Sequence, residues 1–341
     1  CQQGRLYEVE EWIQQGFPLQ CPFEAARSSR HKSALAIALE TGQHSLTLLL
    51  LRSGYRPNDE RISPFNIALK KRRKDLIDLL FKYDADPHRV DLYDLFDSYD
   101  TKLFERFRSA GVDLTKDHIM AEHLADHTSN KPLFGFAKRC RETCPAIQTE
   151  LDMALGGHVH ENNEKGVMLC LWAGADPYAS VPDLRYGRND DSAELWGTSI
   201  EEAVHSGNLH ALKLFKPDPA RIDFDELYGM SRNRAHVQFL AEIKPPGNIT
   251  QIVKNLSHYA GLTWFIEYDW AGTTEAVLSC GIQWEPAEPK VLADIRRNLL
   301  KAKDWELGCI VKALQTPEVC APENFHELTR TPSMQKRLLD Q

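Results

Sequence analysis

Histidine and cysteine side chains near the middle of the sequence have spacings that could bind a metal ion. His123 and His127 lie four residues apart on a segment with a helical pattern, so both could face one ion. Cys140 and Cys144 share that spacing. No CxxC pair and no HExxH motif accompanies them, and the spacing matches no dedicated zinc module. We therefore expect core thiols and surface histidines here, with no metal ion and no cofactor.

A second candidate is the basic run, Lys70-Lys71-Arg72-Arg73-Lys74, in a chain whose formal net charge is -8. Such a run can attract phosphate groups or an acidic protein segment, with strong salt dependence. Short runs of lysine and arginine are also common on solvated helices. Net acidity argues against nucleic-acid binding over the whole surface. The run indicates a solvated edge or, alternatively, a site for an acidic protein partner, with nucleic acid or an anionic lipid surface as a third interpretation.

Motifs of the common enzyme classes are absent from the sequence. It contains no P-loop, no GxGxxG or GxSxG motif and no kinase signature, so we expect no catalytic residue and no enzyme activity. The longest leucine run, Leu48 to Leu51, is far too short to span a bilayer. The 8 cysteines are scattered and resemble no disulfide scaffold. These features predict a cytoplasmic, intracellular protein without a membrane span.

The elements that carry these residues are short helices in pairs. Between Ser33 and Asn58, leucines follow a helical spacing on two short segments separated by Gly42. Ser33 can accept a hydrogen bond from free backbone N–H groups, and Gly54 can adopt the left-handed conformation that ends a helix. Two helices this short cannot bury their apolar faces alone, so further copies must cover them.

This segment resembles one ankyrin repeat, with the pattern T-P-L-H-x-A-A-x-x-G-x-x-x-[IV]-V-x-x-L-L-x-x-G-A-D-x-N. Ser33 stands for the capping Thr, Gly42 for the turn and Gly54 for the closing glycine. A second copy begins at Ser63, and the resemblance is specific over residues 4–88 and 149–216. Closing turns recur at intervals of roughly 34 residues, close to the ankyrin period of about 33. The resemblance implies an all-α, ankyrin-type helical repeat solenoid of about ten helix-turn-helix units.

We expect this solenoid to cover residues 1–341 as a single domain that starts within a repeat, and to belong to a larger polypeptide or complex. Residues 178–197 form a loop insertion, and residues 282–341 form divergent capping helices; the C-terminal copies could instead be general helix-pair repeats. Trp12 and Trp172 fall at core positions of second helices. The insertion either extends a binding surface or folds back over a neighbouring repeat with Trp196 buried.

The resemblance implies a scaffold that binds a partner protein through loop tips and the concave face of the first helices. An alternative is that the array is the targeting domain of a larger enzyme. We expect the insertion and the turns to supply the contacts. The candidate partner-binding residues are Lys70, Lys71, Arg72, Arg73, Arg185, Tyr186, Arg188, Trp196 and His205.

Overall fold

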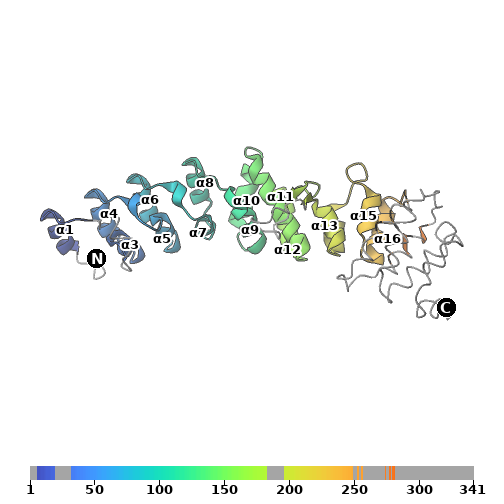
Figure 1. Cartoon of the computed structure of the whole chain (residues 1–341), viewed down its shortest axis with the longest axis horizontal. Helices are drawn as coiled ribbons and strands as arrows, with labels where there is room; N and C mark the ends of the chain where they lie inside the picture. Colours follow the sequence, from blue (N-terminus) through green and yellow to red (C-terminus); the bar gives the residue numbers. More distant parts are fainter. Residues whose placement is uncertain are drawn as a thin grey trace, which may run out of the picture. The chain divides into compact units, whose positions relative to one another are not determined.

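The computed structural model describes residues 6–19, 32–182 and 196–248, together with the single positions 252, 255, 273, 276, 277, 279 and 280. Apart from one two-stranded ladder, the regular structure of these residues is helical, with fifteen α-helices (Figure 1). The chain divides into two compact units. Unit 1 contains residues 1–154 and 172–174, and unit 2 contains residues 155–171 and 175–341. Within the described part of the chain, no helix is long and apolar enough to cross a membrane.

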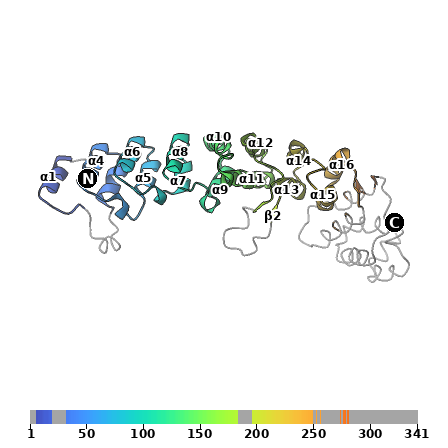
Figure 2. The same cartoon turned by 90° about the horizontal axis from the view of Figure 1, so that it is seen from above.

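Unit 1 is built from helix pairs, each with a first and a second helix joined by a tight turn. They are α3 (Ala34–Glu40) with α4 (His44–Arg52), α5 (Pro64–Lys70) with α6 (Lys74–Lys82), α7 (Leu92–Phe96) with α8 (Thr101–Ser109), and α9 (Ile119–Asp126) with α10 (Lys131–Cys140). The first helices α3, α5, α7 and α9 pack in succession. The second helices form another row, in which α4 packs on α6 and α8 on α10 (Figure 2). Helix α1 (Leu6–Gln14) contacts α4.

Left-handed residues repeat with the pairs. Gly42 and Gly54 have positive φ after α3 and α4, Arg72 and Asp84 do so after α5 and α6, and so do the matching residues after α7 and α8, Tyr99 and Gly111. Within each of these pairs the two positions are twelve residues apart. This conformation turns the chain sharply and lets the next N–H groups reach the last carbonyls of the helix. The α9–α10 turn differs, because residues 127–130 include no positive φ.

Side-chain caps start four of the eight helices from α3 to α10, namely α3, α7, α8 and α10. The Ser33 hydroxyl accepts a hydrogen bond from the Ala36 N–H at 3.0 Å, as expected. Ser63 occupies the same position before α5, but its buried hydroxyl has no hydrogen-bond partner among the described residues. Pro64 follows it at the first helical position, where its fixed φ favours the helix. The proposed serine cap is therefore replaced at the second copy by a proline start.

Aromatic side chains join successive pairs in the core of unit 1. Phe65 of α5 lies with its ring centroid 4.8 Å from that of Phe81 and 5.1 Å from that of Phe107. Leucines fill the remaining inner faces, and Leu46, Leu50 and Leu51 of α4 are buried. Because these contacts cross from one pair to the next, no pair completes its core alone.

Hydrogen bonds between neighbouring loops add a second connection. The Asn58 side chain donates to the Asp84 carbonyl at 2.9 Å and accepts from the Asp86 N–H at 2.6 Å. One guanidinium, that of Arg89, donates to the carbonyls of Asn58 and Glu60. All of these residues lie in or beside two short 3-10 helices, η1 (Pro57–Asp59) and η2 (Pro87–Arg89). A third, η3 (Lys116–His118), leads into α9.

The division between the units falls within α11 (Pro145–His160) and α12 (Glu164–Ala173). In unit 2, α13 (Ser199–His205) packs on α14 (Leu209–Phe215) and on α15 (Phe224–Met230), and α15 packs on α16 (Arg234–Ile243). A capping box between Thr198 and Glu201 starts α13. Strands β1 (Val181–Pro182) and β2 (Trp196–Gly197) pair antiparallel, so the expected insertion is closed at its base by a ladder.

The prediction that Trp12 and Trp172 are core residues is wrong. Trp12 is 56% exposed and Trp172 is 53% exposed. The indole of Trp12 instead packs edge-on against Phe17, and the Lys138 ammonium lies 4.1 Å from the ring centroid of Trp172. Trp172 lies on the exposed face of α12, whose buried positions are taken by smaller residues such as Ala173, and α1, which carries Trp12, has no buried residue.

Candidate functional site

The basic run lies at the turn between α5 and α6, and three of its five cations have acidic partners in unit 1. The Lys70 ammonium is 3.1 Å from a carboxylate oxygen of Asp94, and Lys74 pairs with Asp100. Both carboxylates belong to the next helix pair, α7–α8. These two ion pairs therefore join the α5–α6 turn to the α7–α8 turn.

Arg73 also holds the fold together. Its guanidinium donates to both carboxylate oxygens of Asp75, at 2.8 and 2.7 Å, and to the Gly42 carbonyl of the preceding turn at 2.8 Å. The hydrogen bond from Arg73 is the main reason that the pKa of Asp75 falls to about 2. Lys70 and Arg73 were both candidate partner contacts, and the structure gives them bonds within the fold.

Lys71 and Arg72 are the two cations of the run that remain exposed without an ion pair among the described residues. Arg72 has a φ of 53° and occupies the position that Gly42 holds in the preceding pair. Tyr99 holds the equivalent position in the following pair, has a φ of 55° and is 37% exposed. Its hydroxyl lies 3.3 Å from that of Ser129. We call the turn residues Lys71, Arg72 and Tyr99 the turn edge.

His205, the remaining candidate outside the insertion, lies at the end of α13 and is half-buried. Its Nε2 is 2.8 Å from a guanidinium nitrogen of Arg232, so this side chain takes part in the packing of unit 2. Arg185, Tyr186 and Arg188 lie outside the described residues. The backbone of Trp196 opens β2 opposite Pro182. The base of the insertion is thus defined, and its three central candidates stay sequence predictions.

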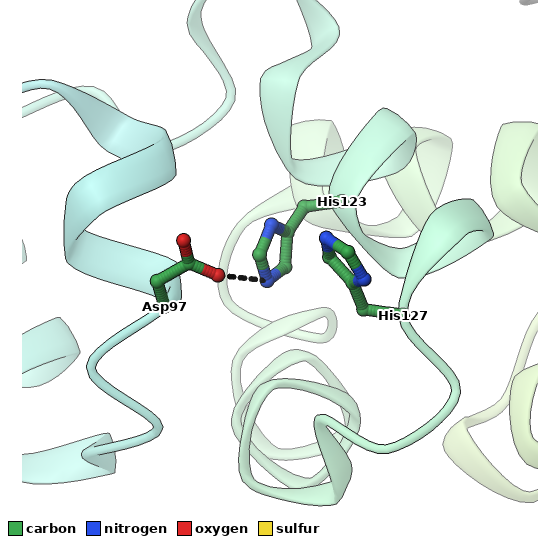
Figure 3. A group of neighbouring side chains, drawn as sticks. All are labelled: Asp97, His123 and His127. Atoms are coloured by element: carbon green, nitrogen blue, oxygen red, sulfur yellow. Dashed lines mark ion pairs between the residues drawn. The ribbon is translucent and has the colours of Figure 1, made fainter.

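A group that the sequence suggested only in part lies beside the turn edge. His123 of α9 and His127, which ends that helix, are joined by Asp97, which ends α7 (Figure 3). Ligand atoms of all three side chains lie within 4.8 Å of one another. Asp97 comes from a different helix pair, and no spacing along the chain pointed to it. Cys140 and Cys144 are free thiols and are not members of this group.

The electrostatics of this group keep His123 uncharged near neutral pH. The pKa of His123 is lowered to about 4, mainly by burial; the nearby His127 charge acts in the same direction, and Asp97 and Asp126 act against it. The imidazole of His123 is 1% exposed, whereas Asp97 and His127 are exposed. Solvent thus reaches the group from the side of Asp97 and His127.

Comparisons with known proteins give no relative on which a function could be based. No protein-family model matches the chain, and no curated protein matches it. The functional assignment accordingly depends on the repeated pairs, the turn edge and the Asp97–His123–His127 group.

Proposed function

We propose that the chain is an ankyrin-type helical-repeat protein that binds a partner protein. Support comes from the agreement between the ankyrin pattern and the observed turns. Ser33, Gly42 and Gly54 recur thirty positions later as Ser63, Arg72 and Asp84, and the turn and closing residues keep positive φ. In an array of this kind, the turns and first helices remain available for contacts with other proteins.

The observation that carries the proposal is the left-handed backbone of two turn-edge residues, Arg72 and Tyr99. A residue other than glycine in the left-handed conformation costs about 1–2 kcal/mol, and Gly42 avoids this cost at the same position. Arg72 and Tyr99 nevertheless occupy it in successive pairs, and both are exposed. Backbone strain held at an exposed position is typical of functional sites. Arginine and tyrosine are also enriched among residues that dominate protein interfaces.

The chemistry of the turn edge favours an acidic protein segment with an apolar or aromatic side chain. Lys71 and Arg72 supply two cations, and Tyr99 supplies an aromatic surface at the turn of the following helix pair. Nucleic-acid binding fits less well, because most of the basic run is already paired and phosphate-binding proteins typically make about 6–10 phosphate contacts. The proposed activity is therefore binding without catalysis.

The test replaces both left-handed residues by glycine. Arg72→Gly/Tyr99→Gly removes the side chains while relieving the backbone, so we expect an unfolding free energy that is unchanged or raised by about 1 kcal/mol. A partner captured with the wild-type protein from native lysate, once identified, should bind the double variant at least about tenfold more weakly, a loss of about 1.4 kcal/mol.

Lys216→Gly is the matched control. Lys216 is also a cation with positive φ, at 50°, but it ends α14 in unit 2. This variant should bind the partner as the wild type does. Equal binding of the partner by all three proteins would contradict the proposal. The wild type could instead be retained on DNA or anionic vesicles in a salt-sensitive way, and the double variant not; that result would favour nucleic acid or lipid as the partner.

A further inference from the structure

We propose that Asp97, His123 and His127 form a binding site for a divalent transition metal of the zinc class. The two histidines lie four residues apart at the end of α9, and Asp97 reaches them from the end of α7 (Figure 3). This is the one group of three or more such ligands that the described residues bring together. The proposal reverses the expectation from the sequence, which considered the histidines without Asp97.

The distances fit one ion after rotation of the two exposed side chains. Zinc binds histidine nitrogen and carboxylate oxygen at about 2.0–2.2 Å, so two ligands of a tetrahedral site lie about 3.4 Å apart. The Asp97 oxygen and the His123 Nε2 are 3.8 Å apart, and the three ligand atoms lie within 4.8 Å of one another, both wider than that spacing. Because Asp97 and His127 are exposed, their side chains can rotate to close these gaps.

His123 presents the form of imidazole that a metal needs. The Asn130 amide is fixed in orientation, since its oxygen accepts from the Leu133 N–H at 3.2 Å and its nitrogen donates to the Phe96 carbonyl at 2.9 Å. The same nitrogen lies 3.0 Å from His123 Nε2, so it turns an N–H toward that atom. His123 Nε2 therefore carries a lone pair, and an ion reaches it only after the Asn130 side chain gives up this hydrogen bond and turns away from the ring.

The position in the fold gives the ion a structural role. Among the turns that join the two helices of a pair in the described part of unit 1, the α9–α10 turn is the one that lacks a left-handed residue. An ion held by the ends of α7 and α9 would fix this turn to the preceding pair. The donor set of two nitrogens and one oxygen suits zinc, copper or nickel, whereas calcium and magnesium prefer oxygen ligands alone. Water completes the coordination on the exposed side.

The experiment uses the full chain, freed of metal with a chelator and titrated with zinc chloride by calorimetry. We expect one saturable site per chain and slower hydrogen exchange in α7 and α9 when zinc is bound. Replacement of outer-shell partners typically weakens metal sites by about 10- to 100-fold, so loss of a direct ligand in His127→Ala or Asp97→Asn should weaken zinc binding at least as much. His127 and Asp97 are exposed, and both variants should keep the fold.

Two controls identify the ligands. His44→Ala removes a histidine of α4 that belongs to no ligand group, and Cys140→Ser/Cys144→Ser removes two free thiols of unit 1. Both variants should bind zinc as the wild type does. Absence of saturable binding, undiminished binding by His127→Ala, or loss of binding in the cysteine variant would overturn the proposal. The Arg72→Gly/Tyr99→Gly variant keeps all three ligands, so this result is independent of partner binding.

Discussion

Replacement of Gly166 by alanine tests the packing of unit 2 through the sign of its effect. Gly166 lies in the first turns of α12 and is buried against the ring of His158 from α11. A Cβ atom at Gly166 would lie 2.3 Å from both Cγ and Nδ1 of that ring and 2.5 Å from Cδ2. Contacts this short do not occur between real atoms, so either the ring or the helix must shift by about 1 Å.

Two effects of opposite sign compete in Gly166→Ala. The higher helix propensity of alanine would stabilise the protein by up to about 1 kcal/mol. Insertion of a methyl group into a filled site destabilises by about 1–3 kcal/mol, and more where the neighbour cannot move. His158 is 0% exposed, so its ring has no free space to enter. We expect a net destabilisation of about 1–3 kcal/mol.

Gly156→Ala is the matched control in the same unit. Gly156 lies in the interior of α11, and the nearest atom to an added Cβ is the Ser199 hydroxyl oxygen at 3.9 Å, an ordinary contact. This variant should be unchanged or more stable by up to about 1 kcal/mol. The two substitutions have the same chemistry and differ in the space available.

The assay combines urea unfolding, followed by circular dichroism, with hydrogen exchange of peptides from α11 and α12. Exchange in these helices should accelerate in Gly166→Ala and not in Gly156→Ala. In a double-mutant cycle, His158→Ala should reduce the cost of Gly166→Ala, because the ring that clashes is absent. A Gly166→Ala protein as stable as Gly156→Ala, or a cost that is the same with and without the His158 ring, would refute the packing argument.

Two further predictions concern buried side chains. Leu50→Ala should destabilise unit 1 by about 2–5 kcal/mol. The loss should be clearly larger than for Leu49→Ala, because Leu50 is 1% exposed and Leu49 is only half-buried. Equal midpoints of urea unfolding for the two variants would contradict this prediction. The pKa of His236 is lowered to about 4, mainly by burial and then by the Arg232 charge. As pH falls from about 6.5 toward 4, His236 therefore binds a proton in the unfolded chain but not in the folded one, and the folded protein loses stability. Neither ring nitrogen of His236 has a hydrogen-bond partner among the described residues. His236→Leu should therefore raise the melting temperature at about pH 5 and make that temperature less dependent on pH. An unchanged dependence of the melting temperature on pH would contradict this prediction.

Much of the helical organisation could be predicted from the sequence because the signals are local. The spacing of Leu35, Leu39 and Leu46 predicts α3 and α4, and Gly42 and Gly54 predict their ends, as observed. The exposed face of α12 was harder to predict, since Trp172 has the apolar character of a core residue. The structure shows that the Trp172 ring is exposed and that the Lys138 side chain lies over it.

The candidate sites required contacts between distant positions, which local patterns do not contain. The basic run was visible as five charges, but the partners Asp94 and Asp100 lie one helix pair later. The two offsets, 24 and 26 residues, are shorter than the thirty residues from Ser33 to Ser63, so counting one repeat ahead of each lysine misses both acids. Asp97 gave no sequence signal either, because it meets the two histidines only through the packing of α7 on α9.

The bonds between neighbouring loops have a consequence for folding during synthesis. Arg73 donates a hydrogen bond to the carbonyl of Gly42, 31 positions earlier in the sequence. The Asn58 side chain donates to the carbonyl of Asp84, which is synthesised 26 positions later. A helix pair that has just left the ribosome therefore lacks these bonds until the next pair has also emerged. Translation adds about 5–20 residues per second, so each pair spends a second or more incomplete. The growing chain thus carries one unfinished pair nearest the ribosome, and a pause before α6 has emerged would expose an already emerged α4 to chaperones for longer.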